Sequence, residues 1–182
     1  MQTLIFNGSP KKNGDTQALI NAFVSRLHGE VKIISVCNNI APCNDCRHCW
    51  ENIGCSIQDD MQDIYAFLST CDVVALASPI WFSSLSGPLL NMASRLQMLW
   101  AAGYFQQKHL LPKEKKGIIM LVGAQPETMD VPAQTALGIM KHMNVRRQSV
   151  EIIYSLETNT LPADKDLVAL RKCREIAESL NR

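Results

Sequence analysis

The sequence predicts a doubly wound α/β fold, in which helices cover both faces of a parallel sheet. Two observations lead to this prediction. Short apolar runs alternate along the chain with segments of helical spacing, and each run is continuously apolar rather than alternating, as in strands buried on both faces. Strand followed by helix five times, with right-handed crossovers, gives a parallel sheet. With 182 residues and no internal repeat or Pro/Gly linker, we expect a single domain over residues 1–182.

Five runs are predicted strands because they are short, apolar and partly β-branched. They cover residues 3–6, 31–36, 73–77, 118–122 and 148–153.

Helices are predicted between these strands from apolar residues three and four positions apart. A capping box of Asp59 and Gln62 opens the second helix, expected over 60–69, and Asp130 or a near neighbour caps the fourth. Apolar stripes mark the first helix (Leu19, Ala22, Phe23, Leu27), the third (Leu89, Met92, Ala93, Leu96, Trp100) and the last (Leu167, Leu170, Ala177, Leu180).

Composition excludes several classes of function. A net charge of +1 with 19% charged residues gives no electrostatic footprint for nucleic acid. The amino-terminal residues lack the pattern of a signal peptide, and no apolar stretch approaches the length of a membrane span. We therefore expect a cytoplasmic protein without a membrane partner, whose seven cysteines stay reduced or bind metal.

Three loops follow predicted strands, and ligands of open parallel sheets bind at that edge. The most informative is NGSPKKNGDT, residues 7–16, where Gly8 and Gly14 permit tight turns. Polar side chains of Ser9, Asn13 and Thr16, with Lys11 or Lys12, surround the start of a helix, which favours a phosphate. The alternative is an ordinary turn in which Thr16 or Asp15 caps the helix.

The second loop, SPIWFSSLSG, places two large aromatic residues at the end of a buried strand. Exposed rings in a loop favour a flat partner, so Trp81 or Phe82 beside a phosphate loop indicates a flavin mononucleotide site. The alternative is that both rings pack into the core against the third helix.

The segments GSPKKNGDTQAL, PCNDCRHCWENIGCSIQDDM and SPIWFSSLSGPLL, in this order, resemble the flavodoxin-like family of NAD(P)H-dependent FMN reductases and its iron–sulfur flavoprotein branch. The resemblance covers about residues 1–96. It implies a three-layer α/β/α fold with a five-stranded sheet of order 2-1-3-4-5, FMN at the strand ends, and homodimers or homotetramers in which a neighbour helps enclose the flavin.

By position, the resemblance implies two sets of FMN-binding residues. The phosphate would be held by Ser9, Lys11, Asn13, Thr16 and Gln17, and the ring by Pro79, Ile80, Trp81, Phe82, Ser83, Gly123 and Ala124. The chain departs from the family at Asp15, where Asn is common and a carboxylate would repel a phosphate unless it turns away. It departs also at Leu90 and Ser94, where the family carries Lys and Asp, although Arg95 remains.

Four cysteines, Cys43, Cys46, Cys49 and Cys55, follow the spacing C-x2-C-x2-C-x5-C. Such compact spacing is typical of a cluster held by one loop, whereas structural zinc more often uses two separated pairs. The resemblance implies a [4Fe–4S] cluster. Reduced or redox-active thiols and zinc remain alternatives.

The resemblance thus implies an NAD(P)H-dependent oxidoreductase in which hydride passes to the flavin N5 and then to a second acceptor, a small molecule or a protein. No side chain is identified as an acid or base; backbone N–H groups near Ser83 and Gly123 are the candidates for stabilising the reduced ring. A second hypothesis is an electron carrier that combines FMN with the cluster. A third is a binding module that holds zinc.

Overall fold

The computed structural model describes the backbone of residues 1–182 and all side chains except that of Thr128. Its main sheet is parallel, with the strand order β2-β1-β3-β5-β6. Counted in chain order, these strands have the predicted order 2-1-3-4-5. The strands are β1 (Gln2–Asn7), β2 (Glu30–Ser35), β3 (Val73–Trp81), β5 (Lys115–Val122) and β6 (Val145–Ser155).

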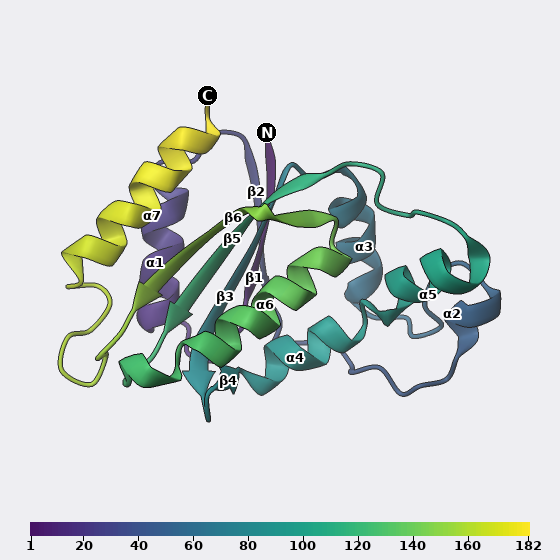
Figure 1. Cartoon of the computed structure of the whole chain (residues 1–182), viewed down its shortest axis with the longest axis horizontal. Helices are drawn as coiled ribbons and strands as arrows, with labels where there is room; N and C mark the ends of the chain where they lie inside the picture. Colours follow the sequence, from purple (N-terminus) through teal and green to yellow (C-terminus); the bar gives the residue numbers. More distant parts are fainter.

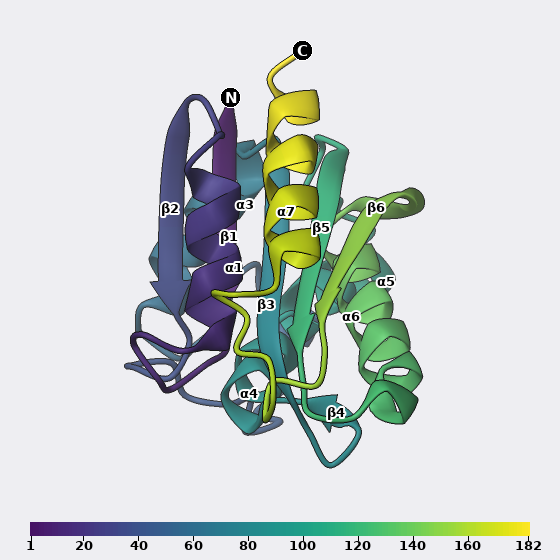
Figure 2. The ribbon, with the colours of Figure 1, turned by 90° about the vertical axis from the view of Figure 1, so that its left-hand side faces the viewer.

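Helices lie on both faces of this sheet, which confirms the three-layer arrangement (Figure 1). One face is covered by α1 (Asp15–Val24) and α7 (Leu167–Leu180), which lie side by side in front of the strands in Figure 2. The other face carries α3 (Met61–Thr70), α4 (Gly87–Ser94) and α6 (Asp130–His142). Beyond this layer, α5 (Gln97–Gln106) lies beside α2 (His48–Glu51) at one end of the molecule (Figure 1).

Two apolar clusters, one on each face of the sheet, form the core. Leu4 and Phe6 of β1 point into the cluster under α3, α4 and α6, while Ile5 between them points into the cluster under α1 and α7. All three side chains are fully buried. The strands are continuously apolar because helices cover both faces of the sheet, so successive side chains are buried on alternate faces.

Some predicted details are wrong. The third helix is two helices, because α4 ends at Ser94 and α5 begins at Gln97, so Trp100 leaves the predicted stripe and is 40% exposed. Leu167 is 75% exposed rather than buried, because it is the first residue of α7, directly after the cap Asp166. Neither α2 nor the short strand β4 (Ser84–Leu85) was predicted.

The predicted capping box of α3 is wrong, because the helix begins at Met61 and its N-cap Asp60 makes no side-chain cap bond. Asp59, one residue earlier, accepts the N–H of Met61 at 3.1 Å and not that of Gln62 with its side chain. Gln62 does not return to the helix start but donates to the carbonyls of Cys55 and Ile57.

Within the described residues, no helix combines the length and the apolar character that crossing a bilayer requires.

Candidate functional site

The three predicted loops meet at the carboxyl edge of the sheet, at the foot of the strands in Figure 2. Gly8 donates its N–H to the carbonyl of Ala77 at 2.8 Å and accepts a hydrogen bond from Ser86 Oγ at 2.7 Å. A Cβ added at Gly123 would lie 3.2 Å from the side chain of Ile80. The fold therefore packs the first loop against the second, and the second against the third.

The first loop is shaped by Asn7, a residue that sequence reasoning missed. Its Oδ1 accepts the N–H of Ser9 at 3.0 Å, and its Nδ2 donates to Gln17 Oε1 at 2.9 Å. Ser9 Oγ in turn accepts the N–H of Lys11 at 3.2 Å. A polar residue ending an apolar strand was the available signal, because a buried amide there must find partners in the adjoining loop.

The start of α1 has no side-chain cap among the described residues. Gly14 occupies the N-cap position in extended conformation, and the Asp15 carboxylate turns away to accept the N–H of Ala163 at 2.8 Å. Thr16 is buried, with 2% of its surface exposed. The alternative of a simple capping turn is therefore not supported. The first-turn N–H groups, which lack intrahelical acceptors, remain available to an anion.

The second loop is a β-hairpin. Trp81 of β3 pairs with Ser84 of β4, and between them Phe82 and Ser83 have φ values of 49° and 54°. Two consecutive left-handed residues are typical of a type I′ turn. Trp81 is 43% exposed and Phe82 is fully exposed, so the alternative that both rings pack into the core is wrong.

The remaining predicted ligands lie around these loops. Lys11 and Asn13 are exposed and line a groove of about 420 Å³ together with Gln17. Pro79 and Ile80 are half-buried at the end of β3, and Ala124 is exposed just after β5.

One predicted role is corrected. The N–H of Gly123 donates to the carbonyl of Ser155 at 3.1 Å, so it is not free to stabilise a reduced ring.

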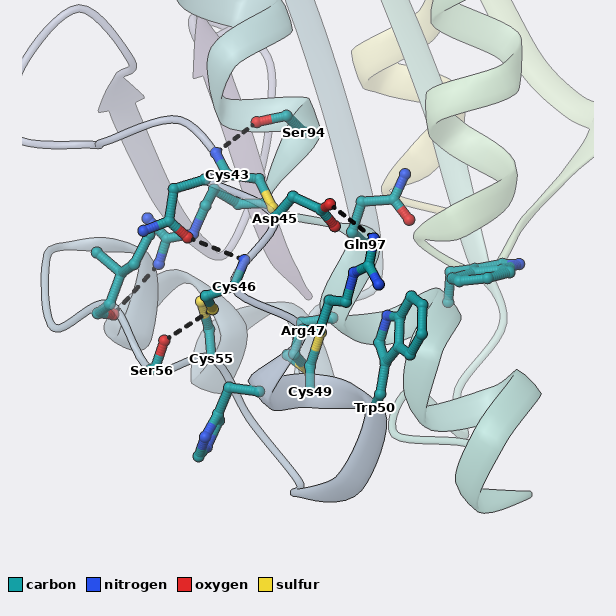
Figure 3. Close-up of a pocket in the computed structure, with 16 residues that line it drawn as sticks. Cys43, Asp45, Cys46, Arg47, Cys49, Trp50, Cys55, Ser56, Ser94 and Gln97 are labelled. Carbon is teal, nitrogen blue, oxygen red and sulfur yellow. Dashed lines mark hydrogen bonds and ion pairs between the residues drawn. The ribbon is translucent and has the colours of Figure 1, made fainter.

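One cavity of about 360 Å³ is lined by all four cysteines of the C-x2-C-x2-C-x5-C segment (Figure 3). Cys43 and Cys46 are exposed, and Cys49 and Cys55 are half-buried. A hydrogen bond with Ser56, at 3.2 Å from sulfur to oxygen, together with the His48 backbone lowers the pKa of Cys46. Burial raises the pKa of Cys49, and the neighbouring thiols raise it further. The loop thus brings together the four residues that the sequence predicted as a group.

These thiols do not converge on a single ion. Among the described side chains, no group of three or more His, Cys, Asp or Glu residues is placed to hold one metal ion. Tetrahedral zinc requires four ligands within about 2.3 Å of one point, whereas a [4Fe–4S] cluster distributes its cysteines over four irons. As the described side chains lie, they therefore single out neither zinc nor a cluster, and what the four thiols share is one cavity.

An aromatic cluster borders the cysteine cavity. The Arg47 guanidinium lies over the Trp50 ring at 4.8 Å, as Figure 3 shows, and Trp50 stacks on Phe105 of α5 with centroids 4.6 Å apart. Gln106, also on α5, donates to the carbonyls of Cys49 and Asn52, both at 2.9 Å. No sequence pattern indicates this packing, because α2 and α5 meet only in three dimensions.

The fold and the loops at its carboxyl edge define a flavodoxin-like α/β protein whose first helix begins there without a side-chain cap. Residues 1–161 match the NADPH-dependent FMN reductase family, and the chain belongs to that family. A curated relative, the iron–sulfur flavoprotein of Methanosarcina thermophila, is 28% identical over 121 residues, which are 64% of this chain and 60% of that protein. The match spans between about half and three fifths of the length of these curated relatives.

Solved structures agree on the fold. An NAD(P)H:quinone oxidoreductase from Methanothermobacter marburgensis has a TM-score of 0.71 at 14% identity, covering 100% of this chain and 96% of that one. An FMN-dependent NADH-azoreductase from Bacillus anthracis str. Ames Ancestor, in complex with FMN, has a TM-score of 0.70 at 13% identity, with both chains fully covered. At such identities the likeness establishes the flavodoxin-like fold alone.

Proposed function

We propose that this protein is an FMN-dependent oxidoreductase that oxidises NADH or NADPH and reduces a second acceptor, either a small molecule or a protein. The observation that carries the proposal is the uncapped start of α1 at the carboxyl edge, with the Asp15 carboxylate turned toward Ala163. First-turn N–H groups and the helix dipole favour an anion there, and Lys11 adds positive charge. The N–H groups and Lys11 would hold a phosphate there, and they must outweigh the carboxylates of Asp15 and Asp164, which line the same groove.

The residues that would hold FMN are those of the three loops. Ser9, Lys11, Asn13, Thr16 and Gln17 would bind the phosphate, while Pro79, Ile80, Trp81, Phe82, Ser83, Gly123 and Ala124 would line the ring. When bound, FMN supplies the hydride and electron-transfer chemistry. The chain positions the cofactor, and the exposed rings of the hairpin offer it a flat apolar surface.

The test of this proposal is a titration of purified protein with FMN, followed by flavin fluorescence, and an assay of NADH and NADPH oxidation. Thr16→Val keeps the buried volume but removes the hydroxyl, and we expect FMN affinity to fall about tenfold. The matched control is Thr135→Val on α6, whose hydroxyl donates only to the Val131 carbonyl. Protein that neither retains FMN nor oxidises either nucleotide would overturn the proposal.

We further propose that residues 1–182 act as one domain, in the cytoplasm, as a homodimer or homotetramer. The fully exposed Phe82 beside a half-exposed Trp81 supports assembly, because such rings at a hairpin tip favour an apolar partner. Light scattering on FMN-loaded protein tests this part. A monomer at all concentrations would contradict it.

A second candidate function is an electron carrier that combines FMN with a [4Fe–4S] cluster. It is favoured by the cavity that all four loop cysteines line. The relatives named iron–sulfur flavoprotein support it as well.

Iron and sulfide analysis of protein purified without air tests the second candidate. We expect about four irons per chain, the content of a [4Fe–4S] cluster. Cys55→Ser should lose this iron, while Cys37→Ser should keep it, because Cys37 is a half-buried thiol outside the cavity. Colourless protein that contains zinc would support the binding-module alternative instead.

A further inference from the structure

Arg95, at the end of α4, is fully buried and ties together the two ends of the cysteine loop. Its Nη1 donates to the carbonyl of Ala41 at 2.9 Å, and its Nη2 donates to the carbonyl of Ile57 at 3.2 Å. Ala41 precedes the first loop cysteine and Ile57 follows the last. One guanidinium thus bridges the neck of the loop, which we define as the backbone of Ala41 and Ile57.

Asp59 completes the bridge. Its Oδ2 lies 2.6 Å from Arg95 Nη1 and also accepts the N–H of Ala41 at 3.0 Å. Gln62 supports the same end of the loop by donating to the Ile57 carbonyl at 2.7 Å. We call Arg95, Asp59 and Gln62 the clasp.

One donor of the clasp has no acceptor. Arg95 Nε is buried and has no hydrogen-bond partner among the described residues, while Arg95 lines the cavity that the four cysteines surround. A buried donor without an acceptor costs free energy, which the hydrogen bonds made by the two Nη groups must offset. Four thiolates around iron and sulfide form an anion, which a buried guanidinium complements.

We propose that Arg95 is a positioning residue that closes the neck of the cysteine loop and holds the four thiols around one cavity, where its buried positive charge would favour an anionic group. The identity of that group rests on the iron–sulfur candidate function. The closure of the loop does not, since it is made by hydrogen bonds of the chain itself.

Thiol alkylation of the cluster-free protein, mapped by mass spectrometry, tests the closure. Arg95→Lys keeps the charge but cannot reach three acceptors at once, so we expect the half-buried Cys49 and Cys55 to react about tenfold faster. Cys71 and Cys173, which are fully buried in the core, report on global unfolding and should stay protected. Arg171→Lys, in an exposed ion pair on α7, is the matched control.

Unchanged labelling of Cys49 and Cys55 in folded Arg95→Lys would overturn the proposal. If the core thiols react faster as well, the variant has opened globally and Gln62→Met decides. That change removes only the hydrogen bonds to Cys55 and Ile57, so a selective rise at Cys55 supports the clasp and no rise refutes it.

A second measurement concerns the bound group. After anaerobic reconstitution, Arg95→Lys should retain several-fold less iron than wild type and alter the visible absorption spectrum, while FMN binding is unchanged. Equal iron content and spectrum would refute a role of Arg95 in holding the bound group. Failure of wild type to take up iron would contradict the cluster, and the labelling result would still decide the clasp.

Discussion

Gly8→Ala should disturb the loop of residues 7–16, which we propose holds the FMN phosphate, more than a methyl group added at Gly14 or Gly123 would. An added Cβ would lie 2.8 Å from Ser86 Oγ, 3.0 Å from Leu89 Cβ and 3.1 Å from the Ala77 carbonyl oxygen. Neither Leu89 Cβ nor the Ala77 carbonyl can rotate away. Ser86 could rotate, but only by giving up its 2.7 Å hydrogen bond to the Gly8 carbonyl.

Overpacking of this kind costs about 1–3 kcal/mol. For a chain of this size each kcal/mol lowers Tm by about 2–4 °C, so we expect a fall of about 2–12 °C. Because the methyl group displaces the start of the loop that would hold the phosphate, FMN affinity should also fall about tenfold, the equivalent of about 1.4 kcal/mol.

Thermal unfolding and fluorescence titration with FMN measure both effects. The control is Gly138→Ala within α6, where an added Cβ meets no atom within 4 Å; this variant should gain about 0.5–1 kcal/mol from helix propensity. A Tm for Gly8→Ala equal to that of wild type would refute the packing argument. A lower Tm with unchanged FMN affinity would refute the placement of the phosphate.

Three further predictions concern the charged core and the hairpin. Burial alone would raise the pKa of Asp59, but hydrogen bonds from Arg95 and from backbone N–H groups outweigh it and lower the pKa. The Asp59 carboxylate therefore contributes stability above the unfolded pKa of about 3.9, and this contribution is lost as pH falls through the folded value. In acid titrations of unfolding, Asp59→Asn should lack that loss. Burial lowers the pKa of Lys115, so the unfolded state binds more protons and the free energy of unfolding rises with pH up to about 10.4. In urea unfolding, Lys115→Met should be more stable than wild type at pH 7, and the difference should shrink toward pH 10. A difference that stays constant with pH would contradict the lowered pKa of Lys115. Phe82→Gly should relieve the left-handed strain and raise stability by about 1 kcal/mol while weakening FMN binding; a loss of stability would show that the ring packs on the protein.

The sequence by itself determined the fold class and most of the residues at the carboxyl edge. Continuous apolar runs separated by helical stripes predict a parallel sheet with two helical layers, because that arrangement buries both faces of every strand. The loops NGSPKKNGDT and SPIWFSSLSG could be placed at one edge because the carboxyl ends of parallel strands meet there. Cysteine spacing also grouped Cys43 to Cys55 correctly around a single cavity.

Only the tertiary structure decided the partners of these residues. Asp15 turns to Ala163, which lies 148 positions away, and Arg95 reaches Ala41 and Ile57, which lie 54 and 38 positions away. No periodicity encodes such contacts, because a buried polar group takes whatever acceptor the packed chain brings near. The break between α4 and α5 was likewise visible only in the tertiary structure, where it falls at Arg95, the residue that bonds to Ala41 and Ile57.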